Sequence, residues 1–379
     1  MVWTISIRWR EALKLLLVNL GILAALYLSA EVALHLYSSA ANPLLGAGAF
    51  RIHDPAFHHG LKPNFEGAEG WVREIYPFRI NSLGFRDAVV RETPLAVDRR
   101  RILFIGDSFT EGLGQPYEQT FVGRFAAAFP ELDVLNAGVT SYAPSTYYEK
   151  IKYFLSKGLK VDEVFVYIDI SDIQDEALSY YYDERGILQW KTDACSPTEP
   201  LWSEKPLWKR AFYVAEFADL YFEKRKLAQL IEKASLKELS QSGYIYSRDW
   251  PRPSWTYDPS ASCFGALGVE GGIRKAKERM DRLHELLAAH GVPLSVGVYP
   301  WPQQLLYDEE NSRQVRIWRD WCAGKCKRFI DHFPAFFEAK RRDPDFVRNL
   351  FIWGDVHYSA RGNEILADGL IKAVRAEPF

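Results

Sequence analysis

Beyond residue 100, short apolar runs alternate with segments of helical periodicity, and this alternation constrains the fold more than any other feature of the chain. Runs of strand type occur at residues 102–105, 134–136, 163–170 and 293–299, and helical spacing occurs at residues 118–129, 145–157, 273–290 and after Ser359. Strands that are apolar on both faces and separated by helices favour a parallel sheet covered on each side. The sequence therefore predicts a three-layer α/β/α sandwich with a mainly parallel sheet.

The N-terminal segment predicts one transmembrane helix in front of this domain. Residues 15–30 (LLLVNLGILAALYLSA) are almost wholly apolar, and helix-compatible residues extend them past the roughly 20 residues that a bilayer span needs. Arg8, Arg10 and Lys14 precede the stretch, so the positive-inside rule leaves the N-terminus in the cytoplasm and the body of the protein in the periplasm. A signal peptide cleaved after residues 38–40 (SSA) is the alternative, and it exports the same body.

We expect three parts along the chain. Residues 1–37 form the cytoplasmic stub and the membrane anchor, residues 38–100 form a linker and an irregular lead-in, and residues 101–379 form the α/β domain. Residues 180–262 interrupt the alternation and are rich in aromatic side chains, so they are predicted to be an insertion or lid. One helix is expected in this insertion, over residues 207–239.

The cysteines suit an exported domain. Four are present, Cys195, Cys263, Cys322 and Cys326. Two disulfides are expected in an oxidising compartment, with three pairings open. A structural zinc site is the alternative, but one close pair and two distant single cysteines match zinc-ligand spacing poorly.

The remaining composition argues against charged partners and metals. The chain has 47 basic and 49 acidic residues, and the basic ones are scattered, so no nucleic-acid partner is expected. His53, His58 and His59 lack acidic or cysteine partners at ligand spacing. Neither a metal site nor a cofactor is predicted.

Polar residues follow the predicted strands at one edge of the sheet, where open parallel sheets bind their ligands. They are Asp107 and Ser108 after the first strand, Asn136 and Gly138 after the second, Ser171 and Asp172 after the third, and Asp355 and His357 before the last helix. Asp107 is expected to brace the turn. Asn136, Asp172 and Trp301, the last of these in a Pro-rich turn after the fourth strand, are predicted substrate contacts.

Three of these residues supply the groups for acyl transfer through a covalent serine. The hydroxyl of Ser108 needs a base, which His357 can provide, and Asp355 can orient and stabilise the imidazole. Backbone N–H groups of Ser108 and Gly138 are candidates for binding the oxyanion. The alternative is structural: Ser108 would cap a turn and His357 would support a loop.

At this point the sequence resembles a known family. GDSFTEG (residues 106–112), NAG (136–138) and DVHYSARGNEILA (355–367) follow the order found in the SGNH, or GDSL-type, hydrolases. The resemblance covers roughly residues 100–375 apart from the insertion. It implies a flavodoxin-like sheet, Ser108 as nucleophile, His357 as base with Asp355 as its orienting partner, and Gly138 as an oxyanion donor.

One block departs from the family pattern. Ser171 stands where an Asn side chain usually donates to the oxyanion, and Asp172 follows it. A hydroxyl gives one hydrogen bond from a shorter and freer side chain, and losing an oxyanion donor costs about 2.7–4 kcal/mol in the transition state. Either Ser171 substitutes, another group does, or the enzyme is slow.

The expected function is an extracytoplasmic serine esterase that removes O-acyl groups, above all O-acetyl, from a cell-surface or secreted polysaccharide. The substrate is implied by the family and the location, since no residue identifies it. Alternatives are a polysaccharide O-acetyltransferase with the same triad and a membrane partner that delivers the acyl group, or a catalytically weak glycan-binding scaffold. A phosphate or nucleotide binder lacks a glycine-rich cradle. The expected partners are an acylated glycan and the inner membrane.

Overall fold

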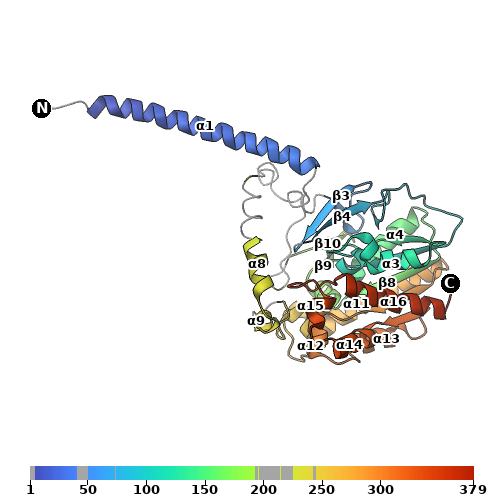
Figure 1. Ribbon diagram of the computed structural model, residues 1–379. Helices are drawn as coiled ribbons and strands as arrows, with labels where there is room; N and C mark the ends of the chain where they lie inside the picture. The colour runs from blue at the N-terminus through green and yellow to red at the C-terminus, as the bar shows by residue number, and fades with distance from the viewer. Residues whose placement is uncertain are drawn as a thin grey trace.

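The computed structural model describes residues 5–40, 50–72, 74–192, 195, 214, 225–241 and 245–379. Within these residues, the body is built on an eight-stranded sheet with the order β12-β11-β8-β6-β7-β5-β4-β3. Figure 1 shows the helices gathered around this sheet and the long helix α1 extending away from the body.

Five of the strands are parallel and form the predicted α/β core. They are β6 (Arg101–Gly106), β7 (Asp133–Asn136), β8 (Glu163–Ile168), β11 (Leu294–Val298) and β12 (Arg328–Asp331). Every residue of β6, β8 and β11 is buried, as expected for strands covered on both faces. The chain adds β7 on one side of β6 and β8 on the other, so the order of strands reverses there and opens a crevice at their carboxyl ends.

Strand β12 was not predicted from the sequence. Its four residues, RFID, begin and end with a charged side chain, so they lack the continuous apolar run of a buried strand. Pairing with β11 in parallel register completes this edge of the sheet.

Helices cover both faces of the parallel strands (Figure 1). On one side α3 (Phe121–Ala128) packs against α16 (Ala360–Ala376), and on the other α11 (Gly268–Ala289) packs against α4 (Pro144–Ser156) and α5 (Asp172–Leu178). The remaining helices in the C-terminal part are α12 (Pro302–Tyr307), α13 (Arg313–Cys322), α14 (Phe333–Arg342) and α15 (Phe346–Leu350). The predicted three-layer sandwich is confirmed.

The expectation of an irregular lead-in is wrong for the part that precedes β6. Strands β3 (Glu66–Trp71), β4 (Glu74–Ile80) and β5 (Arg86–Asp87) continue the central sheet in antiparallel fashion, while β1 (Arg51–Asp54) and β2 (His58–Leu61) form a separate hairpin. Only β4 has alternating burial, and its partner β3 (EGAEGW) is too polar and glycine-rich to show a strand pattern. These strands form because they pair with each other and with β7, although their local sequence has little strand propensity. Residues 41–49, near the start of the predicted linker and lead-in, lie outside the described residues.

The insertion is described in part. It contains the hairpin β9 (Tyr180–Tyr182) and β10 (Leu188–Trp190), and the helices α8 (Arg225–Lys233), α9 (Leu236–Gln241) and α10 (Pro251–Ser254). The C-terminal end of the single helix predicted over residues 207–239 is instead divided between α8 and α9, and the rest of that prediction falls largely outside the described residues.

Disulfides join Cys195 to Cys263 and Cys322 to Cys326, which is one of the three pairings left open.

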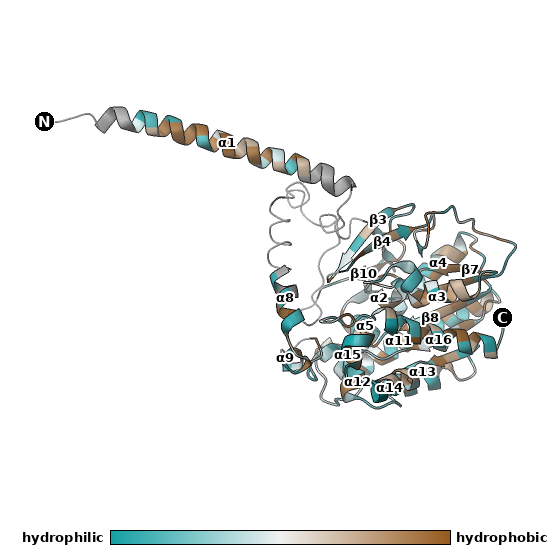
Figure 2. Cartoon of the chain, in the orientation of Figure 1, coloured by the Kyte–Doolittle hydropathy of each residue, from teal (hydrophilic) through white to brown (hydrophobic). Residues whose placement is uncertain are grey.

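Helix α1 (Ile5–Ala40) carries an exposed apolar surface. Its span Trp9–Ala33 has a mean hydropathy of 2.0, and only 6% of it is buried against the rest of the protein. Figure 2 shows the brown, hydrophobic colour along most of this helix. The helix is therefore long and apolar enough to cross a membrane, a criterion that a signal sequence also meets. Its orientation in the membrane remains a prediction.

Candidate active site

The nucleophile candidate lies in a sharp turn at the end of β6. Ser108 is the first residue of the four-residue helix α2 (Ser108–Glu111), and the carboxylate of Asp107 caps that helix by accepting from the Phe109 N–H at 2.9 Å. A Cβ atom on Gly106 would lie 2.2 Å from the Thr110 side chain and 2.8 Å from the Tyr167 carbonyl oxygen. Glycine is therefore required at that position, and the turn directs Ser108 to the carboxyl edge of the sheet.

The loop before α16 carries the other two members of a Ser-His-Asp arrangement. The Nε2 atom of His357 lies 2.8 Å from Oγ of Ser108, and its Nδ1 atom bonds to Oδ1 of Asp355. The same carboxylate oxygen accepts the His357 backbone N–H at 2.8 Å, so the acid and the base share one tight turn. Ser108 and His357 are each 7% exposed. This is the geometry that a hydroxyl needs to pass its proton to an oriented imidazole.

Tyr246, from the end of the insertion, fixes this turn. Its hydroxyl accepts the Gly354 N–H at 2.9 Å and donates to the carbonyl oxygens of Asp355 and Ile352, at 3.1 and 3.2 Å. Gly354 has a φ of 81°, which a residue with a side chain rarely adopts. The insertion thus contributes a buried side chain to the support of the Asp355–His357 turn.

The charge of Asp355 is held by its neighbours. Burial acts to raise the pKa of this carboxyl, but the charge of His357 and the hydrogen bonds from it outweigh burial, so the pKa lies below its usual value. The Trp71 indole N–H faces the same carboxylate and adds to the lowering. Asp355 is therefore ionised at neutral pH, as a group that stabilises an imidazolium must be.

Two aromatic rings enclose the His357 imidazole. The ring of Phe109 lies 4.7 Å away in a tilted arrangement, and half-buried Trp71 packs edge-on with a centroid distance of 5.5 Å. The sequence did not single out Trp71, because it ends β3 in the segment that we expected to be irregular. Its position shows that the antiparallel strands reach the triad.

Two further buried acids, Asp107 and Asp169, follow the strands β6 and β8. Asp107 accepts from the Tyr299 hydroxyl at 3.1 Å, and Asp169 accepts from the Trp301 indole at 2.6 Å and from the Ser171 N–H at 2.7 Å. Burial, with the charge of Asp169 second, raises the pKa of Asp107 well above its usual value. These contacts agree with the bracing role predicted for Asp107.

The predicted oxyanion donors differ in their availability. The Ser108 N–H, at the start of α2, and the Ser171 hydroxyl have no partner among the described residues. The Gly138 N–H, by contrast, donates to Oδ1 of Asn136 at 3.1 Å, within its own turn. This geometry does not favour the role predicted for Gly138.

The predicted substrate contacts require a correction. Asn136, Asp172 and Trp301 are 0%, 0% and 4% exposed. Each bonds inside the protein: Asn136 Nδ2 donates to the Thr110 carbonyl oxygen at 2.7 Å, the Asp172 carboxylate accepts from the Tyr147 hydroxyl at 2.9 Å, and Trp301 donates to Asp169. Sequence reasoning placed them at the right edge of the sheet, but their side chains point into the protein.

The three histidines that precede the catalytic domain lie in the hairpin of β1 and β2. The part of the chain that the structure describes contains no group of three or more His, Cys, Asp or Glu side chains arranged to hold an ion. His58 and His59 contact each other through their Nδ1 atoms at 2.8 Å. Burial lowers the pKa of His58 to about 4 and that of His59 to about 3.

Solved structures of the lipolytic G-D-S-L family resemble this chain. A member of that family from Veillonella parvula DSM 2008 is 12% identical and has a TM-score of 0.38, with 73% of this chain and 98% of the other covered. An acetylxylan esterase, Axe2, from Geobacillus stearothermophilus is 15% identical over 74% of this chain and 96% of its own, with a TM-score of 0.37. No family model and no curated protein matches the chain.

Proposed function

We propose that this protein is a membrane-anchored serine esterase that removes acetyl groups from a glycan outside the cytoplasm. The observation that carries the proposal is the continuous chain of contacts from Ser108 through His357 to Asp355. A serine that only caps a turn does not require a contact with an imidazole whose other nitrogen is bound by a carboxylate. The candidate membrane helix α1 supports the location.

The reaction follows from the roles that the geometry allows. His357 Nε2 takes the hydroxyl proton while Oγ of Ser108 attacks the ester carbonyl carbon, and the carbonyl oxygen becomes an oxyanion. When the tetrahedral intermediate collapses, the C–O bond to the sugar breaks and His357 returns the proton to the leaving sugar oxygen. Water then attacks the acetyl-Ser108 ester, gives its proton to His357, and releases acetate with the serine restored.

The surroundings of Ser108 support a small acyl group and a sugar. Both reacting side chains are only 7% exposed, and Phe109 and Trp71 pack against the imidazole, so little open surface adjoins the nucleophile. The partly exposed ring of Trp71 beside the triad suits the apolar face of a pyranose.

The test uses the full chain in detergent micelles. Acetate release is measured from acetylated xylan and from p-nitrophenyl acetate, butyrate and octanoate, and a fluorophosphonate adduct is sought on Ser108 by peptide mass spectrometry. We expect an adduct that is lost in Ser108→Ala, and rates that fall with acyl length. A folded protein with neither adduct nor acetate release contradicts the proposal and favours the glycan-binding scaffold.

An acceptor oligosaccharide separates hydrolysis from transfer. The acetyl-Ser108 intermediate is the same in both reactions, and only the attacking oxygen differs. With the acceptor present, the esterase still releases its acetyl groups as acetate. Acetylated acceptor as the main product would replace the esterase with the O-acetyltransferase.

A further inference from the structure

Among the described residues, one backbone N–H in the loop after β7 has no acceptor. Each neighbouring backbone N–H in this loop donates to an acceptor within the protein. The N–H groups of Ala137 and Val139 donate to carbonyl oxygens of β6, at Phe104 and Gly106, and that of Tyr142 donates to the Val139 carbonyl oxygen. The N–H groups of Gly138 and Thr140 donate to side chains, Asn136 Oδ1 and Glu111 Oε2. The Ser141 N–H has no acceptor among the residues that the structure describes. Val139 bonds to the last residue of β6 and Thr140 to the last residue of α2, so the two residues before Ser141 are held against the turn that presents Ser108.

The backbone at Ser141 is in a conformation that needs outside support. Its φ is 65°, the left-handed region that residues with a side chain seldom occupy. Such conformations persist where the surrounding structure over-determines them, and they cluster at functional sites. The Tyr180 hydroxyl holds the Ser141 carbonyl oxygen at 2.6 Å.

Glu111 ties this loop to the helix of the nucleophile. Its side chain is fully buried, and Oε2 accepts both the Thr140 N–H at 2.6 Å and the Thr140 hydroxyl at 2.9 Å. On the other side of Thr140, His59 Nε2 lies 2.9 Å from the carbonyl oxygen. Thr140 is therefore held at its N–H, its hydroxyl and its carbonyl, immediately before Ser141.

Arg51 in turn holds Glu111. Its guanidinium contacts both carboxylate oxygens, NH1 to Oε2 at 2.7 Å and NH2 to Oε1 at 2.6 Å, and NH2 also reaches Glu69 of β3 at 2.9 Å. Burial acts to raise the pKa of Glu111, but the charge of Arg51 outweighs it, and the pKa lies below its usual value. A charged acceptor makes shorter and stronger hydrogen bonds than a neutral one, and both Thr140 groups donate to it.

On this basis we propose that Arg51 and Glu111 are positioning residues, which hold Thr140 so that the Ser141 N–H donates to the oxyanion in place of Gly138. The inference rests on the proposed function, since it names how that site binds its transition state. It also gives the hairpin of β1 and β2 a role, because Arg51 of β1 binds the side chain of Glu111, which lies on the same helix α2 as Ser108.

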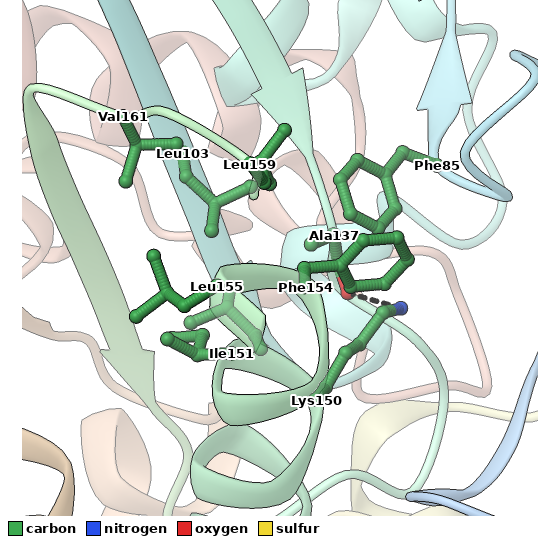
Figure 3. A pocket seen from close by; sticks show the side chains of 10 residues that line it. Phe85, Leu103, Ala137, Lys150, Ile151, Phe154, Leu155, Leu159 and Val161 are labelled. Carbon is green, nitrogen blue, oxygen red and sulfur yellow. Dashed lines mark hydrogen bonds between the residues drawn. The ribbon is translucent and has the colours of Figure 1, made fainter. Parts of the chain in front are cut away.

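A second support lies at the start of the same loop. Figure 3 shows Lys150 of α4 bonded to the Ala137 carbonyl oxygen, at 2.9 Å, among apolar side chains. The loop is thus held at its first residue from α4 and at Thr140 from α2. Of the N–H groups in this loop, the Ser141 N–H is the one without an acceptor among the described residues, and it is the one that we assign to the substrate oxygen.

The decisive experiment compares Thr140→Val with Thr140→Ser in the full chain, assayed on p-nitrophenyl acetate. Valine keeps the shape of threonine but removes the hydroxyl bond to Glu111, whereas serine keeps that bond. We expect Thr140→Val to lower kcat by about 10-fold, part of the 10²–10³-fold that losing a whole oxyanion donor costs, with KM nearly unchanged, and Thr140→Ser to restore kcat. A merely structural role would lower the free energy of unfolding without lowering kcat at an unchanged KM.

Glu111→Gln is the second variant, with Glu66→Gln as its matched control. The glutamine amide has an N–H group where the carboxylate has an acceptor, and it faces the donors of Arg51 and Thr140. We therefore expect a larger fall in kcat than in Thr140→Val. Glu66 of β3 is exposed and pairs with Arg79 at 3.0 Å, without contact to Arg51 or Glu111, and its variant should retain activity. If Glu111→Gln does not fold, Thr140→Val decides alone.

The outcomes separate this inference from the function on which it rests. An active wild type whose folded Thr140→Val variant keeps kcat within about twofold overturns the positioning role, since the transition state would then not depend on this loop. A folded wild type without any esterase activity contradicts the proposed function, and the positioning role falls with it.

Discussion

Nε2 of His357 lies 2.8 Å from Oγ of Ser108, although 249 residues separate the two in the chain. Each residue is supported from a different part of the molecule. Ser108 follows β6 and is capped by Asp107, while His357 is held by Asp355 in a turn that Tyr246 of the insertion fixes from behind. The pairing of base and nucleophile therefore depends on the sheet, the last loop and the insertion together.

Replacing Asp355 with Asn should abolish most of the activity without unfolding the protein. The amide can donate to Nδ1 of His357, which favours the tautomer that cannot accept the proton of Ser108. We expect kcat on acetyl esters to fall by about 10⁴-fold. Asp368→Asn, an exposed position on α16, is the control and should leave the rate unchanged. Retention of more than a tenth of the wild-type rate would remove Asp355 from its predicted role.

The hydroxyl of Ser171 should contribute to the transition state. It follows β8 beside the nucleophile and has no partner among the described residues, so it is available to donate. We expect Ser171→Ala to lower kcat by about 10²-fold with little change in KM, as for the loss of one oxyanion donor. Ser179→Ala is the control, because Ser179 is also buried, at the other end of α5, and its Oγ has no hydrogen-bond partner within the described part of the chain. Equal effects of the two variants would mean that Ser171 acts only through packing.

Lys150 should make the stability of the protein depend on pH in the alkaline range. Its side chain is buried against Phe57, Phe85 and Tyr142, and burial lowers its pKa from 10.5 to about 7. Between these two values the unfolded chain binds a proton that the folded chain does not, so the free energy of unfolding rises with pH there.

Lys150→Met removes this titration and tests it. The stability of wild type relative to the variant should stay constant below about pH 7 and should then rise by up to about 1.4 kcal/mol per pH unit. Denaturant unfolding of both proteins at a series of pH values, followed by circular dichroism, gives the comparison. Parallel curves for the two proteins would show that Lys150 keeps its proton in the folded state.

The two disulfides should differ in what they contribute to stability. Cys195 and Cys263 are 68 residues apart, whereas Cys322 and Cys326 are four apart, so the first closes a much longer loop in the unfolded chain. The chain-entropy model predicts that replacing the first pair by Ser lowers the free energy of unfolding by about 4 kcal/mol, and replacing the second pair by about 2 kcal/mol. Unfolding curves of the two double variants measure the difference. A larger loss from the short loop would contradict the entropic account.

Local patterns in the sequence were enough for the central part of the fold. The apolar runs at residues 102–105, 134–136, 163–170 and 293–299 each correspond to a strand of the parallel sheet, because most side chains of a strand covered on both faces are apolar. Strands β3 and β12 escaped prediction, because four to six residues with polar or glycine positions carry no period of their own. Pairing with a neighbour determines them.

The sequence by itself determined that Ser108, Asp355 and His357 would meet, since each follows or precedes an element whose end lies at the carboxyl edge of the sheet. Only the tertiary structure decided which backbone donor is left unpaired, which rings enclose the imidazole, and that Asn136, Asp172 and Trp301 point inward. The reason is that strand ends are specified by local periodicity, whereas the partners of Arg51, Glu111 and Thr140 come from segments far apart in the chain. Their contacts exist only after the hairpin, the nucleophile's helix and the loop have packed together.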